Sequence, residues 1–114
     1  MFAMNTQKLN DILIKAGFRK EKLDSGFNYS KKVNHIELIC YVEPNINIAF
    51  MSIYRWNDND VKGTYNLSMT GFDRDKDSIS SVFKKTLDNM PEFIGENINV
   101  HQEVKTVIDD TFNL

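Results

Sequence analysis

The chain has few of the residues that usually build redox, metal or nucleotide sites. Its 114 residues include one cysteine, two histidines and five scattered glycines. A single cysteine excludes an internal disulfide and fits a reducing compartment, so we expect a cytoplasmic protein. A phosphate-binding glycine loop, a Gly-x-Ser-x-Gly elbow and a Cys-x-x-Cys pair are all missing. We therefore expect no cofactor, no metal ion and no enzymatic activity.

Long apolar runs and a strong net charge are also missing. No stretch approaches the ~20 apolar residues that a membrane-spanning helix needs, and the start of the chain lacks the pattern of a signal peptide, so no membrane association is expected. The net charge of −2 does not by itself indicate a partner. Its distribution is uneven, because residues 1–35 carry a net +4 and the remaining residues a net −6. This asymmetry predicts a dipole that would orient the molecule toward a charged partner.

Several short patterns resemble metal sites or nucleophiles, but each fits a structural role better. Segment 58–63 has acids at positions one and three and glycine at six, as an EF-hand loop has, yet later ligand positions hold lysine and methionine. The alternating charges of 73–77 fit a helix start. His35 and His101 lack further ligands at metal-like spacing. Cys40 has no basic neighbour on its apolar strand, which predicts a buried core residue.

The apolar pattern predicts one α+β domain over residues 1–114. Leu9, Ile12, Leu13 and Ala16 share one helical stripe, which predicts a helix over 6–16 that ends at Gly17. Five strands of an antiparallel meander should follow. They are 18–24, 27–33, 36–42, 47–56 and 64–70, with a polar loop at 57–63.

Two C-terminal helices should pack on this sheet. A helix over 78–89 has Asp77 as its expected cap, and Pro91 marks its end. Another is predicted over 101–111, with a strand at 97–101 as the alternative because β-branched residues are frequent there. Strands grouped together and helices grouped together are typical of the α+β class with an antiparallel sheet.

Strand 47–56 is apolar on both faces, which is unusual for a sheet with one face in water. We predict that Val42 lies opposite Ile48, because this register gathers the largest apolar residues on one face for the helices to cover. The other face then keeps apolar residues without an obvious cover. They are Ile39, Tyr41, Ala49, Met51 and Ile53.

An apolar face that persists on a small domain usually marks a site for another chain. We expect a non-enzymatic interaction module whose partner is a target protein or a second copy in a homodimer. The predicted partner-binding residues are Ile39, Tyr41, Met51, Ile53, Tyr54, Trp56, Asp58 and Asp60. A narrower hypothesis is an acidic inhibitor or immunity-type protein that meets a basic target, because acids are frequent after residue 35.

Nucleic-acid binding through the first hairpin is the alternative. Its basic residues are Arg19, Lys20, Lys22, Lys31 and Lys32, with Phe27 and Tyr29 between them. Aromatic rings among basic residues on a strand can stack bases. An acidic pI near 5.6 and the lack of an RNA-binding signature motif make this reading weaker.

Overall fold

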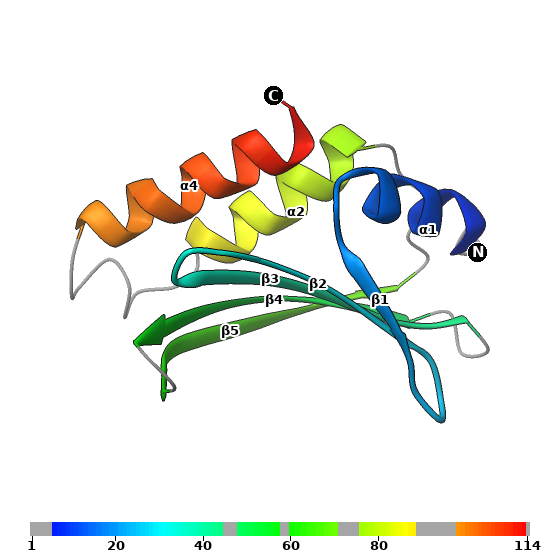
Figure 1. Ribbon diagram of the computed structural model, residues 1–114. Helices are drawn as coiled ribbons and strands as arrows, with labels where there is room; N and C mark the ends of the chain where they lie inside the picture. Colours follow the sequence, from blue (N-terminus) through cyan, green and yellow to red (C-terminus); the bar gives the residue numbers. More distant parts are fainter. Residues whose placement is uncertain (1–5, 45–47, 58–59, 71–75, 89–97, 114) are drawn as a thin grey trace.

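Five strands and three helices form two layers in the computed structural model, which describes residues 6–44, 48–57, 60–70, 76–88 and 98–113. In chain order the elements are α1 Thr6–Lys15, β1 Arg19–Lys22, β2 Phe27–Val33, β3 Ile36–Glu43, β4 Ile48–Asn57, β5 Asp60–Thr70, α2 Lys76–Asp88 and α4 Ile98–Phe112. Neighbouring strands pair antiparallel in the order β1-β2-β3-β4-β5. All three helices lie on the same side of the sheet (Figure 1). The predicted α+β class and layout are confirmed, with four long strands and a short β1 at the edge.

The apolar stripe of α1 explains why this segment is helical, and a glycine in the left-handed conformation ends the helix. Leu9 and Leu13, on the side of α1 that faces the sheet, are buried. Gly17 has a φ of +93°, its amide donates to the Ile14 carbonyl at 3.0 Å, and the Phe18 amide donates to the Leu13 carbonyl at 3.0 Å. These two bonds form a Schellman motif, in which a left-handed glycine closes the helix. The predicted end of this helix is therefore confirmed.

Several predicted boundaries differ from the structure. The predicted loop 57–63 is too long, because β4 continues to Asn57 and β5 already begins at Asp60. Helix α2 begins at Lys76, so Asp77 lies within its first turn and is not the residue before it. Residues 98–101 are helical, so the alternative of a strand there is wrong; residue 97 lies outside the described residues.

The β3–β4 register differs by one residue from the prediction. Val42 pairs with Ala49 and Cys40 pairs with Met51. A slip of one residue moves a whole strand's side chains to the opposite face. The helices therefore cover compact, mostly aliphatic side chains, while the aromatic residues of β4 lie on the other face. The covered side chains are Ile36, Leu38, Cys40, Val42, Ala49, Met51 and Ile53, none more than 2% exposed.

Three aromatic rings join the layers. Phe18, just before β1, lies 6.4 Å from Phe83 of α2 and 6.0 Å from Phe112 of α4, measured between ring centroids. Phe83 and Phe112 are 6.0 Å apart. All three are at most 4% exposed. Such pairs add about 0.5–1.5 kcal/mol beyond the burial of their area. The cluster fixes the start of the sheet against both C-terminal helices.

The register predicts that alanine substitutions of Ile53 and Ile39, which the sequence pattern placed on the same face, lower the free energy of unfolding by unequal amounts. Replacing buried Ile53 with alanine should lower the free energy of unfolding by about 2–5 kcal/mol, because it leaves a cavity under the helices. Replacing half-buried Ile39 with alanine should cost about 1 kcal/mol. Urea denaturation of both variants measures the difference, and equal costs would contradict the register.

Because the thiol of Cys40 is buried, we expect the free energy of unfolding to fall at alkaline pH. Burial raises the pKa of its thiol from 9.0 to about 12. The unfolded thiol ionises near 9 and the folded thiol only near 12, so the contribution of Cys40 is complete below pH 9 and lost between pH 9 and 12. Between pH 9 and 10 the free energy of unfolding should fall by about 1 kcal/mol, at most about 1.4 kcal/mol per pH unit.

The matched control for this titration is Cys40→Ala. Its free energy of unfolding should fall by only about 0.3 kcal/mol between pH 9 and 10, because the fall then comes from Tyr29, whose pKa burial raises from 10.0 to about 12 and which is half ionised in the unfolded chain at pH 10. Urea denaturation at both pH values compares the slopes. The same slope in both proteins would show that the folded thiol ionises normally.

Candidate functional site

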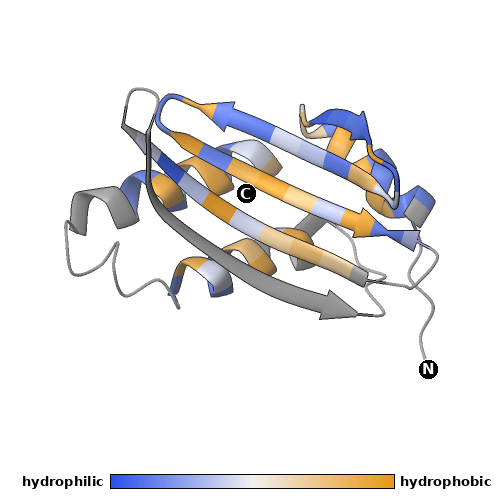
Figure 2. Cartoon of the chain, turned by 90° about the horizontal axis from the view of Figure 1, so that it is seen from below, coloured by the Kyte–Doolittle hydropathy of each residue, from blue (hydrophilic) through white to orange (hydrophobic). Residues whose placement is uncertain are grey.

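One face of the sheet lies away from the helices, and we call it the open face. It is defined by Ile39 and Tyr41 of β3 and by Phe50, Tyr54 and Trp56 of β4. Figure 2 views the molecule from this side, and the strands lie in front of the helices. All five side chains are half-buried. The described part of the chain thus leaves a largely apolar sheet face open to solvent.

Two aromatic pairs divide the open face. The rings of Tyr41 and Phe50, which are direct cross-strand partners, lie 6.2 Å apart and are nearly parallel. The rings of Tyr54 and Trp56 lie 6.5 Å apart in an edge-on arrangement. Between the two pairs, Ile39 lies opposite the small, buried Ser52. Ile39 and Ser52 therefore separate the Tyr41–Phe50 pair, which lies across two strands, from the Tyr54–Trp56 pair, which runs along β4.

Trp56 is held from two directions. Its indole Nε1 donates to Glu37 Oε1 at 3.1 Å. The Lys32 ammonium lies 4.8 Å from the centre of a Trp56 ring, within the range of a cation–π contact. These contacts place Trp56 on the open face, next to an irregularity of the β4–β5 register between Arg55 and Trp56. The two contacts thus hold the ring in one position on the open face.

Hydrogen bonds hold the Tyr41 side chain at the opposite end of the open face. Its hydroxyl donates to Glu43 Oε1 at 2.7 Å and lies 2.8 Å from Ser25 Oγ. The hydrogen bond with Ser25 lowers the pKa of Tyr41, but the hydrogen bond to Glu43, burial and the negative charge of Glu43 together raise this pKa above its ordinary value. Tyr41 therefore stays a neutral hydrogen-bonding group at physiological pH.

Charges of opposite sign lie at opposite ends of the open face. Glu21 shares a register row with Tyr41, and Glu43 lies one row beyond. Arg19 shares the row of Ile39, and Lys32 lies in the row after it, opposite Glu37. Among the described side chains, the second end has two positive charges, Arg19 and Lys32, against the one negative charge of Glu37. The face is thus acidic at the Tyr41 end and basic toward Trp56.

The structure brings together only some of the predicted partner-binding residues. Ile39, Tyr41, Tyr54 and Trp56 lie on the open face. The prediction is wrong for Met51 and Ile53, which are fully buried on the helix side because of the shifted register. Asp58 lies outside the described residues. Asp60 begins β5, and its side chain is not described.

Sequence reasoning missed Phe50 and Glu37, and it named Lys32 only for nucleic-acid binding. A signal for Phe50 was present, because it shares the period-two face of Tyr54 and Trp56. Glu37 and Lys32 had no such signal, since their role depends on the pairing of β2, β3 and β4. Each touches the side chain of Trp56, which is distant in sequence.

The basic first hairpin does not present the stacking platform of the alternative prediction. Tyr29 is only 3% exposed, and its hydroxyl donates to Asn10 Oδ1 at 2.8 Å. The Lys20 ammonium covers the Phe27 ring at 4.4 Å and donates to the same Asn10 oxygen at 2.8 Å. Lys31 donates to the Ala16 carbonyl at 2.9 Å. These aromatic and basic groups bind helix α1 to the sheet.

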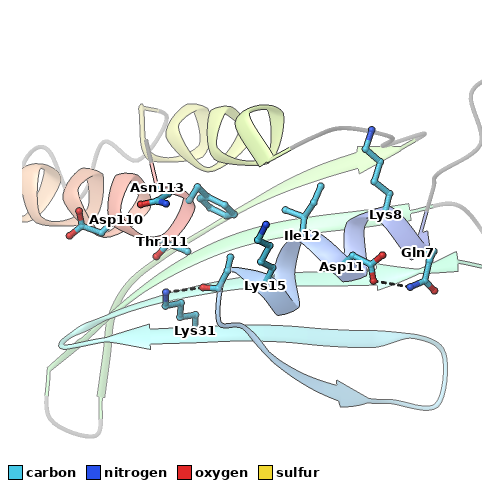
Figure 3. A pocket seen from close by; sticks show the side chains of 11 residues that line it. Gln7, Lys8, Asp11, Ile12, Lys15, Lys31, Asp110, Thr111 and Asn113 are labelled. Atoms are coloured by element: carbon cyan, nitrogen blue, oxygen red, sulfur yellow. Dashed lines mark hydrogen bonds between the residues drawn. The ribbon is translucent and has the colours of Figure 1, made fainter.

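A groove of about 1010 Å³ lies between α1 and the last turn of α4 (Figure 3). Its lysines and aspartates balance closely, with three of the first and two of the second. Lys31 is already bonded to Ala16, and Asp11 accepts from Gln7 at 2.8 Å. The groove therefore offers a ligand no concentration of one charge, and we place the functional site on the open face.

The described residues contain no group of three or more histidine, cysteine or acidic residues that could hold a metal ion. Burial raises the pKa of the Cys40 thiol to about 12, so it stays protonated at physiological pH. No helix among the described residues is long and apolar enough to cross a membrane. Comparison with protein-family models, curated proteins and solved structures found no match to this chain.

The contacts of Trp56 predict a change in its fluorescence quenching. Lys32→Ala and Glu37→Ala should each raise the quenching constant with acrylamide, by about 1.5-fold, because each removes a group that covers or fixes the ring. Trp56 is the only tryptophan, so the signal is unambiguous. Lys22→Ala, an exposed residue of β1, is the control. Unchanged quenching in both variants would contradict the two contacts.

Proposed function

We propose that this protein is a non-enzymatic interaction module that binds another protein chain through its open face. The observation that supports this proposal is the group of half-buried Tyr41, Phe50, Tyr54 and Trp56 on a sheet face that no described helix covers. Aromatic residues are enriched at protein interfaces, where they bury a large area with few rotatable bonds. Apolar surface of this kind usually marks a binding site.

The polar residues around the aromatic centre also fit a protein partner. Glu37 and Glu43 accept hydrogen bonds from Trp56 and Tyr41, and Lys32 covers a ring, so the polar ends of the aromatic side chains have partners already. Docking of another chain would then bury apolar ring surface without leaving these donors unpaired. An apolar centre inside a polar rim is the usual anatomy of a protein interface.

Nucleic-acid binding is the weaker proposal for the same face. Its aromatic rings could stack bases, but the face carries acids as well as bases, and phosphate binding needs a concentration of positive charge. The narrower proposal of an inhibitor for a basic target draws only on Glu21 and Glu43 at one end of the face. The described residues offer no further observation in its favour.

Paired variants test the proposal. Phe50→Lys with Tyr54→Lys forms the open-face variant, and Ile14→Lys, which removes an apolar residue that is 46% exposed on α1, is the matched control. Affinity purification from the native cell with tagged proteins should retain at least one chain, another protein or an untagged copy, on wild type and control. Retention on the open-face variant should fall about tenfold or more, as expected when central aromatic residues are lost.

Two outcomes would overturn the proposal. The first is equal retention of every co-purifying chain by wild type and the open-face variant, while urea denaturation shows both to be folded. The second is a chain that is retained only until nuclease treatment, together with a mobility shift of a single-stranded oligonucleotide that the open-face variant abolishes. That result would assign the rings to base stacking.

A further inference from the structure

We infer, with the proposed function as the basis, that the partner of the open face is a second copy of this chain. The two sheets pack face to face, with their strands running in opposite directions about a twofold axis that crosses the strands. Three properties of the open face support this arrangement: the order of its charges, the relief of its side chains and its size.

The order of charges selects one orientation of the two copies. Along the face, Glu21 and Glu43 lie at the Tyr41 end, while Arg19, Lys32 and Glu37 lie toward Trp56 and give that end one net positive charge among the described side chains. A twofold axis across the strands sets the acidic end of each copy over the basic end of the other. A twofold axis along the strands would set like charges over each other, which disfavours that arrangement. In the first arrangement every favourable contact occurs twice, as twofold symmetry requires.

The relief of the side chains fits the same axis. When the axis passes between the Ile39 and Tyr41 rows, the Tyr41–Phe50 ring pair of one copy lies over the low Ile39–Ser52 row of the other. Ser52 is the smallest of these four side chains, so the opposing rings can pack closely at its position. Packed sheets of this kind lie about 10 Å apart with strand directions within about 30°, which two antiparallel copies can adopt.

The size of the face explains why its charges matter. A stable interface buries about 800 Å² on each partner. Five strands spaced about 4.8 Å apart give a face about 20 Å wide, and eight residues of β3 extend for about 27 Å. The flat outline of such a face, about 540 Å², is smaller than this area, so a stable interface has to use the whole face, its charged ends included. The charged residues are therefore part of the interface.

The test uses two charge-reversed proteins. The basic-end variant carries Arg19→Glu and Lys32→Glu, and the acidic-end variant carries Glu21→Lys and Glu43→Lys. Light scattering after size exclusion should find dimers for wild type in the micromolar range. Each variant alone should associate about tenfold or more weakly, because its two copies set like charges over each other. An equimolar mixture of the two variants should form a dimer again, since opposite charges then meet at both ends.

The controls separate this inference from general loss of structure. Lys22→Glu with Lys105→Glu makes the same charge change as the basic-end variant on exposed residues away from the open face, and it should dimerise as wild type does. Circular dichroism confirms folding. A monomeric wild type, dimerisation that the open-face variant keeps, or a mixture without a dimer would each overturn the inference. If wild type is monomeric but a different co-purifying protein is lost from the open-face variant, the proposed function stands and the second copy does not.

Discussion

The pairing of β3 with β4 is the constraint on which the rest of this structure depends. Strand β4 is apolar on both faces, so its register with β3 decides which of its residues the helices cover. With Cys40 opposite Met51, a compact aliphatic layer meets α2 and α4, and the rings of Tyr41, Phe50 and Tyr54 remain on the other side. The hydrophobic core and the candidate binding face are thus two results of one hydrogen-bonding pattern.

Polar groups have different tasks on the two faces of the sheet. On the helix side, Asn10 accepts from both Lys20 and Tyr29 and so fixes α1 to the edge of the sheet. On the open face, Glu37 and Glu43 hold the polar ends of Trp56 and Tyr41 and leave the ring surfaces accessible. Buried and partly buried donors need hydrogen-bond partners. These contacts therefore permit an aromatic surface to form without unpaired donors.

Local patterns were enough to predict the layout of the fold. The stripe of Leu9 and Leu13, the left-handed Gly17 and the apolar period of α2 depend only on neighbouring residues, and the structure confirms them. The face of each β4 residue could not be predicted in this way, because it depends on its partner strand and on the helices above. Choosing the register by the size of the side chains was wrong, since Phe50 and Tyr54 pack with other rings and not beneath the helices.

The three-ring cluster of Phe18, Phe83 and Phe112 has a consequence for the newly made chain. Adjacent strands of the meander pair locally, so the sheet can assemble soon after residue 70 leaves the ribosome. Phe18 can pack against Phe83 and Phe112 only after these two residues have been translated. In this interval α1 is the only described helix that is already made and can cover the sheet, so much of the apolar surface is exposed and the chain is most prone to aggregation and chaperone binding.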